Sequence, residues 1–211
     1  MMRILASFAL ALMCGLVHAS GTADQRLGAP FTQRERAVLG AETANIVVIE
    51  FSSFKCTHCR TFHEQIFPRL RQLYVETGKV QWVIINASNE AADQTSPVFL
   101  VARDALHQGT YWELVDQLYQ VGLRPPEDLE ALIKNRATTN GQNLADSLQD
   151  PSVRDAVAAD FAEYAALKIR GTPTFLLRKL GRDGRWKRAI IEDLQPLGYF
   201  QQVLDALLKE P

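Results

Sequence analysis

Residues 46–59 read Ile-Val-Val-Ile-Glu-Phe-Ser-Ser-Phe-Lys-Cys-Thr-His-Cys, and they contain the strongest fold signal in the chain. Its first six residues form an almost unbroken apolar run, which is typical of a central strand buried on both faces. Its end opens a helix, in which Cys59, Phe62 and Ile66 recur at three- and four-residue spacing and therefore share one apolar face. A buried strand that leads directly into an amphipathic helix favours an α/β fold.

The rest of the chain supplies the other elements of that fold. Apolar residues from Val80 to Ile85 predict a second strand, and the pattern is helical from Asn89 to Lys168. Two further strands, Thr174 to Arg178 and Lys187 to Ile191, flank a turn bounded by glycines, and a last helix begins at Pro196. The predicted order is strand, helix, strand, helical block, two strands, helix.

Three local expectations accompany this order. Residues 20–44 are mixed and polar and predict a leading arm with little regular structure. Pro68 lacks a backbone N–H and should kink the first helix. The basic residues from Arg178 to Arg188 surround the hairpin turn, which favours a solvated hairpin tip over a patch for polyanions or membrane surfaces.

The composition is typical of one globular domain, and the N-terminal residues indicate that it is exported. A formal net charge of −1 over 211 residues leaves no electrostatic footprint for nucleic acid. Residues 1–19 have the features of a signal peptide, with Arg3 ahead of an apolar run and small residues before a cleavage site after Ala19. Because that run is shorter than the about 20 residues of a membrane span, we expect export to the periplasm and a domain at residues 20–211.

Two cysteines remain after cleavage, because Cys14 leaves with the signal peptide. Cys56 and Cys59 close too small a loop to stabilise a fold of this size, so in an oxidising compartment they point to a working disulfide. Cys56 stands at the helix N-terminus, where backbone N–H groups lower a thiol pKa, and is the expected reactive thiol. Cys59 lies one turn further on the apolar face and is the expected resolving thiol. Weaker alternatives are an inert surface disulfide or a structural zinc site with His58 and His63.

Charged residues also lie close to the two cysteines in the sequence. His58 lies between the cysteines, and as an imidazolium it would stabilise the Cys56 thiolate and make the disulfide a stronger oxidant, with Lys55 adding to the same field. The alternative is that both side chains are merely solvated. Glu50 is a carboxylate within the buried strand, where an unpaired charge costs several kcal/mol. We expect Glu50 beneath Cys59, exchanging a proton with it, unless an edge of the sheet exposes it.

The motif Cys56-Thr57-His58-Cys59 after Glu50-Phe51, with Gly171-Thr172-Pro173-Thr174-Phe175 far downstream, resembles the DsbA family of thioredoxin-like proteins. The resemblance covers nearly the whole chain after the signal peptide. It implies a thioredoxin-like α/β fold with an all-helical insertion, at about residues 89–168, between the second strand and a hairpin that follows a cis proline.

The resemblance also implies roles for individual residues. It implies that Pro173 is cis, that Glu50 is the family's buried acid and that His58 stabilises the thiolate. A cis bond would present the backbone of Thr172 to the sulfurs and to a bound peptide, so Thr172 and Pro173 are expected to bind substrate. Two positions depart from many family oxidants. Thr57 stands where they have proline. Thr172, the residue before the cis proline, resembles the residue at that position in the isomerases DsbC and DsbG, and also in some oxidants.

Together these features predict a periplasmic dithiol oxidase that needs no cofactor. Its expected substrates are reduced or misfolded exported proteins, and the family implies a membrane reoxidant similar to DsbB. Isomerases of the DsbC type carry a long N-terminal dimerisation domain, for which residues 20–44 are too short, so we expect a monomer. The alternatives are a disulfide isomerase or reductase, and a chaperone-like module that binds unfolded exported chains.

Overall fold

The computed structural model describes residues 36–134, 148–181 and 185–210. The predicted signal peptide at residues 1–19 lies outside these ranges, as do residues 182–184 of the predicted hairpin turn. No helix within the described ranges is both long enough and apolar enough to cross a membrane.

A five-stranded mixed sheet forms the centre of the molecule, with the strand order β1-β3-β2-β4-β5. The strands are β1 (Ala37–Leu39), β2 (Ile46–Ser52), β3 (Val80–Asn86), β4 (Thr174–Leu180) and β5 (Trp186–Glu192). β2 runs parallel to β3, and every other neighbouring pair is antiparallel. β2 is therefore the middle strand, as its apolar run predicts.

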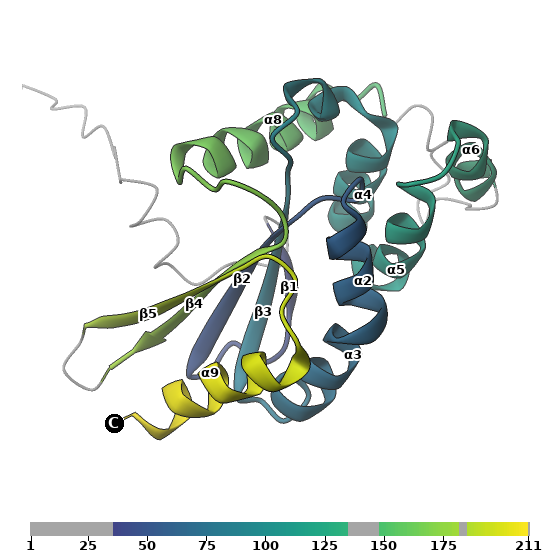
Figure 1. Cartoon of the computed structure of the whole chain (residues 1–211). Coiled ribbons are helices and arrows are strands. Elements are labelled where there is room, and N and C mark those ends of the chain that lie inside the picture. Colours follow the sequence, from purple (N-terminus) through teal and green to yellow (C-terminus); the bar gives the residue numbers. More distant parts are fainter. Residues whose placement is uncertain (1–35, 135–147, 182–184, 211) are drawn as a thin grey trace, which may run out of the picture.

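Helices lie on the sheet and beyond one end of it (Figure 1). The segment after β2 comprises α2 (Thr57–Gln65), α3 (Phe67–Leu70) and the π-helical turn η1 (Arg71–Val75). The insertion contains the 3-10 helix η2 (Ala91–Thr95), α4 (Pro97–His107), α5 (Tyr111–Val121), α6 (Pro126–Lys134) and α8 (Pro151–Ala166), and α9 (Leu197–Lys209) ends the fold. The insertion helices gather at the top of Figure 1, and α9 crosses the lower part of the sheet.

The predicted interruption of the first helix is confirmed. α2 ends at Gln65, Ile66 has φ −115° and ψ −50°, and α3 begins one residue before Pro68. Pro68 has no N–H to donate to Glu64, so the regular hydrogen-bond ladder cannot continue through this turn.

An aromatic cluster fixes α2 against the sheet. The Phe62 ring lies 4.6 Å from the Phe175 ring and 5.3 Å from the Phe200 ring, centroid to centroid, and stacks on Trp82 at 6.0 Å. These rings come from α2, β4, α9 and β3. Because close aromatic pairs add to the energy of burial, the cluster holds the N-terminus of α2 in one position relative to the strand ends.

Two local expectations are wrong in part. Residues 20–44 are not irregular throughout, because β1 pairs antiparallel with β3 and the Trp112 Nε1–H of α5 donates to the Val38 carbonyl at 2.8 Å. At the hairpin, Arg185 and Arg188 are exposed as expected, but the two basic side chains at its base are buried. Arg178 is 1% exposed, with its guanidinium 4.6 Å from the centre of the Trp186 ring, and buried Lys179 donates to the Leu207 carbonyl at 2.9 Å.

Candidate active site

The two cysteines stand where the central strand turns into α2. Cys56 is the N-cap of α2, with extended backbone angles (φ −103°, ψ 121°), and its carbonyl accepts the Arg60 N–H at 3.1 Å. Its sulfur is partly exposed, whereas Cys59 is fully buried one turn further along, and both thiols are free. The predicted division into an accessible and a covered thiol is therefore present in the structure.

Hydrogen bonds lower the pKa of Cys56 to about 5. The largest contribution is the Cys59 thiol, which donates to the Cys56 sulfur, and it outweighs the opposing effect of partial burial. The backbone N–H groups of Cys59 and His58 and the Thr172 hydroxyl add to it. Because all of these donors favour the charged form, the helix tip holds Cys56 as a thiolate at neutral pH.

Burial raises the pKa of Cys59 far above its usual range, and the neighbouring Cys56 sulfur raises it further. Two donors partly oppose this effect: the Ser52 hydroxyl, and the Ser53 N–H, which lies 3.5 Å from Cys59 Sγ. The pair thus consists of one ionised thiol at the surface and one neutral thiol below it.

The loop before β4 faces the Cys56 sulfur. The Thr172–Pro173 peptide bond is cis, as the resemblance implied, and a protonated Cys56 thiol would donate to the Thr172 carbonyl at 3.1 Å. A hollow of about 390 Å³ runs from His58 past Thr172 and Pro173 to Asp193. An extended peptide in this hollow would lie beside the accessible sulfur.

Asp193 is a part of the site that the sequence interpretation missed. Its Oδ1 lies 2.6 Å from His58 Nδ1, and its carboxylate raises the His58 pKa, which keeps the ring protonated to higher pH. Asp193 has φ 63°, and its N–H donates to the Pro173 carbonyl at 2.8 Å. One residue between β5 and α9 thus joins the histidine of the motif to the proline loop. An aspartate tolerates this left-handed conformation, but nothing in the sequence relates it to His58.

Glu50 is buried, and both of its carboxylate oxygens have donors. His63 Nε2 lies 2.9 Å from Oε1, and Trp82 Nε1–H donates to Oε2 at 2.9 Å. His63 is itself buried, and its ring stacks on Tyr119 at 4.1 Å, centroid to centroid. The buried carboxylate is therefore paired, which offsets much of its desolvation cost, and its role as a proton relay to Cys59 stays a prediction.

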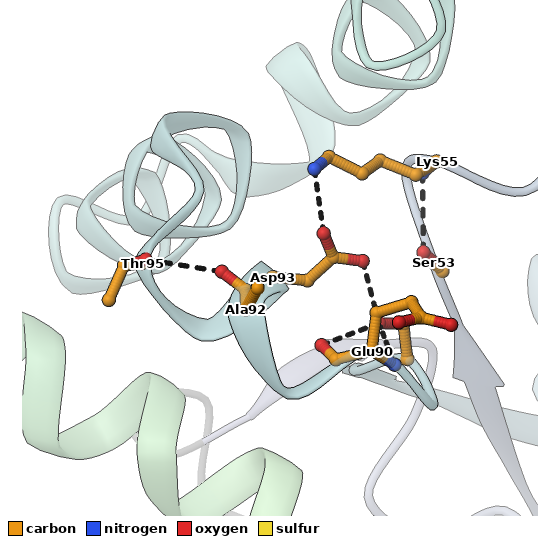
Figure 2. Close-up of polar contacts among 7 residues, drawn as sticks. Ser53, Lys55, Glu90, Ala92, Asp93 and Thr95 are labelled. Atoms are coloured by element: carbon orange, nitrogen blue, oxygen red, sulfur yellow. Dashed lines mark hydrogen bonds and ion pairs between the residues drawn. The ribbon is translucent and has the colours of Figure 1, made fainter.

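Lys55 does not act as expected. Figure 2 shows its ammonium turned toward Asp93. Lys55 Nζ lies 2.6 Å from Asp93 Oδ1, and the Ser88 hydroxyl donates to Asp93 Oδ2 at 2.7 Å. The Lys55 backbone N–H donates to the Ser53 hydroxyl at 3.2 Å. Because the Asp93 carboxylate neutralises the ammonium, Lys55 joins the loop before Cys56 to η2 of the insertion and adds little net field at the thiolate.

No cluster of three or more histidine, cysteine or acidic side chains suited to a metal ion occurs in residues 36–134, 148–181 or 185–210. The structural-zinc alternative therefore has no ligand set within those ranges.

Known proteins resemble this chain in sequence and in fold. The family model described as Thioredoxin matches residues 32–185. The probable disulfide bond formation protein D of Bacillus cereus is 27% identical over 154 residues, which cover 68% of this chain and 70% of that protein.

Two solved structures share the fold. Alpha-DsbA1 of Wolbachia pipientis superposes with a TM-score of 0.70 at 20% identity, over 89% of this chain and 96% of that one. Oxidised BdbD from Bacillus subtilis gives 0.67 at 20% identity, over 84% and 95%. These matches confirm the predicted thioredoxin-like fold with its helical insertion.

Proposed function

The chain belongs to the DsbA-like branch of the thioredoxin family of protein-disulfide oxidoreductases, and on that premise we propose that it oxidises dithiols of exported proteins. The observation that carries the proposal is the position of Cys56 at the N-cap of α2, with its sulfur 3.1 Å from the Thr172 carbonyl and surrounded by donors that lower its pKa. A stabilised thiolate favours the reduced form of the pair, and the disulfide form is then a strong oxidant.

The reaction proceeds by two exchanges. A substrate thiolate attacks Cys56 Sγ of the disulfide form, a substrate–Cys56 bond forms, and the Cys56–Cys59 bond breaks with its electron pair on Cys59, which then takes up a proton. A second substrate thiolate attacks the substrate sulfur of the mixed disulfide, and Cys56 leaves as the stabilised thiolate. The substrate loses two electrons, and the cysteine pair gains them.

Four other residues support these steps in the proposal. Thr172 and Pro173 hold an extended substrate segment along the hollow beside Cys56. His58 stabilises the thiolate through its backbone N–H and, as an imidazolium, through its charge. Glu50, which is buried and hydrogen-bonded to His63, takes up and returns the proton of Cys59.

The compartment and partners belong to the same proposal. The signal-peptide pattern of residues 1–19 favours the periplasm, where reduced exported proteins would be the substrates. A membrane protein similar to DsbB would reoxidise the pair, and no cofactor takes part because the two sulfurs carry both electrons. We further propose that the protein acts as a monomer.

A disulfide isomerase or reductase is the second candidate, and Thr172 before the cis proline favours it. Such an enzyme must hold a misfolded chain through several exchanges, whereas an oxidant releases its substrate after one. A chaperone-like binding module would need neither exchange to be fast.

One preparation tests these candidates. Reduction potential against glutathione, oxidation of a reduced dithiol peptide, rescue of scrambled ribonuclease, and sedimentation are measured side by side, with a Cys56→Ala variant as the control. The oxidase proposal expects a monomer with an oxidising potential, rapid peptide oxidation and poor rescue. A stable oligomer with strong rescue and slow peptide oxidation would favour the isomerase, and a redox-inert pair that still suppresses aggregation would favour the binding module.

A further inference from the structure

The outer strand of the sheet, β5, carries an exposed apolar surface. It is the edge strand at the left of Figure 1, and within the described residues no strand pairs with it on the side away from β4. Four large apolar side chains are exposed in the part of the chain that the structure describes, and three of them lie on the β4–β5 hairpin: Leu180 at 52%, Trp186 at 36% and Ile190 at 62%. Single exposed apolar residues are common, whereas a group of them marks a binding surface.

These three side chains lie on one face of the hairpin. Leu180 stands directly opposite Trp186 in the β4–β5 register, and Ile190 follows Trp186 by four residues, so the two β5 side chains point the same way. Lys179, next to Leu180, points to the other face, where it donates to a carbonyl of α9. The hairpin strip formed by Leu180, Trp186 and Ile190 therefore lies on the face away from α9.

The backbone of β5 adds hydrogen-bonding groups at the same place. The Gly181 N–H donates to the Arg185 carbonyl, and the Asp193 N–H donates to the Pro173 carbonyl, both at 2.8 Å. Bonded positions alternate in an antiparallel pair, so the odd-numbered residues of β5 bond to β4. The even-numbered residues direct their N–H and C=O groups away from β4, and they are Trp186, Arg188, Ile190 and Glu192. Such an edge can pair with another extended chain.

This edge leads to the reactive sulfur. β5 ends at Glu192, and Glu192 and Asp193 line the hollow that passes Thr172. The Thr172 carbonyl lies 3.1 Å from Cys56 Sγ. A substrate segment that leaves the hollow past Glu192 therefore comes next to the outer edge of β5.

We propose that the outer edge of β5 is a second substrate-binding surface, at which an extended segment of the reduced exported chain pairs as an additional strand. This inference rests on the proposed function and extends its substrate site beyond the hollow. Backbone hydrogen bonds do not depend on the substrate sequence, and the hairpin strip favours segments whose alternate residues are apolar. Unfolded chains expose such segments and folded proteins bury them, so the surface selects chains that have not yet folded.

The test compares dithiol peptides as substrates of the oxidised wild-type protein. One peptide is short and fills only the hollow. Two others carry an extension of seven residues, the length of β5, with valine at alternate positions, on either the N-terminal or the C-terminal side. A fourth repeats the better extension with methylated backbone nitrogens, which removes the donors needed for strand pairing and keeps the apolar side chains.

We expect one extension to lower KM about five- to tenfold, the effect of a few cross-strand contacts. The kcat should stay the same, because contacts remote from the sulfurs bind ground state and transition state alike. The other extension should have no effect, since β5 lies on only one side of β2, the strand that leads to Cys56. Methylation should return KM to the value of the short peptide.

Variants of the hairpin strip test the side-chain contribution. Leu180→Thr and Ile190→Thr remove apolar surface but keep a β-branched residue that suits a strand. Each should reduce the ratio of the short-peptide KM to the extended-peptide KM about two- to threefold. Trp186 is left in place because its ring lies over the Arg178 guanidinium. The matched control is Tyr199→Thr, since Tyr199 is the exposed apolar side chain outside the hairpin, on α9, and it should keep the wild-type ratio.

Other outcomes overturn the inference. These are an equal KM for all peptides, an equal gain from both extensions, or a methylated extension that keeps its gain. Two results would assign the edge to another occupant: a wild-type dimer in sedimentation that Ile190→Thr dissociates, which indicates a second copy, or a gain that appears only after residues 20–35 are removed. The proposed function fails separately, if oxidised wild type oxidises none of the peptides.

Discussion

Lowering the pH from 7 to 4 protonates the Cys56 thiolate of the reduced protein and leaves the disulfide form without a corresponding change. The folded-state pKa of Cys56 is about 5, below the value of about 8.5 for an unperturbed cysteine. A thiol whose pKa is lower in the folded than in the unfolded state stabilises the fold. This contribution is complete when the pH is above the unfolded-state pKa, and it is lost as the pH falls through the folded-state pKa of about 5. The reduced protein should therefore lose stability relative to the oxidised protein between pH 7 and pH 4.

The size of the loss follows from the same pKa values. At pH 7 the folded thiol is about two pH units above its pKa and the unfolded thiol is still protonated, which corresponds to about 2.7 kcal/mol at about 1.4 kcal/mol per unit. Cys56 is partly exposed, so solvent screening reduces this figure to about 1–2 kcal/mol. By the same thermodynamic cycle, the reduction potential at pH 7 would be about 20–45 mV more oxidising than that of an unperturbed pair.

Urea unfolding of the reduced and oxidised proteins at pH 7 and pH 4 measures this difference. The free energy of unfolding of the reduced form minus that of the oxidised form should fall by about 1–2 kcal/mol at the lower pH. His58 and Asp193 titrate in both forms, so most of their effect cancels in the subtraction. Cys59 stays neutral over the whole window because its pKa is raised.

The control is the Cys56→Ala variant, whose stability should lack this additional pH dependence. A reduced-minus-oxidised difference that is the same at both pH values would refute the reasoning. So would thiolate absorbance that titrates near about 8.5, because Cys56 would then gain nothing from its donors.

Four further substitutions test single residues. His58→Ser should raise the Cys56 pKa and make the protein a weaker oxidant, and Asp193→Asn should lower the His58 pKa by removing its main partner; thiolate absorbance and NMR titration measure these effects, and an unchanged potential in His58→Ser would leave the ring a bystander. Glu50→Gln should slow resolution of mixed disulfides more than it changes the Cys56 pKa, which stopped-flow exchange from pH 6 to 8 measures; equal rates would assign Glu50 a structural role. Thr172→Val removes a hydroxyl donor to the Cys56 sulfur, so it should raise the Cys56 pKa and lower the potential while peptide oxidation persists; a potential equal to wild type would contradict this.

Local sequence patterns were sufficient to predict the strand and the helix that place the two cysteines. The apolar run before Glu50 predicts a buried strand, and the stripe of Cys59, Phe62 and Ile66 predicts the helix that follows. Both signals lie within one short stretch of chain, because strand and helix periodicities are properties of neighbouring residues. The exposed and buried positions of Cys56 and Cys59 follow from that helix alone.

The partners of those residues were decided by tertiary structure. Asp193 reaches His58 only because β5 ends beside the start of α2, and Tyr119 reaches Ser52 only because α5 packs over the end of β2. A hydrogen bond between residues so far apart in the chain leaves no periodic signal in a single sequence.

Pairing between distant strands explains the unpredicted strand β1, and pairing within the β4–β5 hairpin explains the burial of Arg178. β1 is short and follows a polar segment, so no alternating pattern of apolar residues predicts the strand that pairs with β3. In the sequence Arg178 is a charged residue near a turn, whereas in the fold the Trp186 ring across the β4–β5 hairpin lies over its guanidinium. The reactive cysteine pair can be recognised from neighbouring residues, whereas the donors and charges around the two sulfurs come from distant segments that only packing brings together.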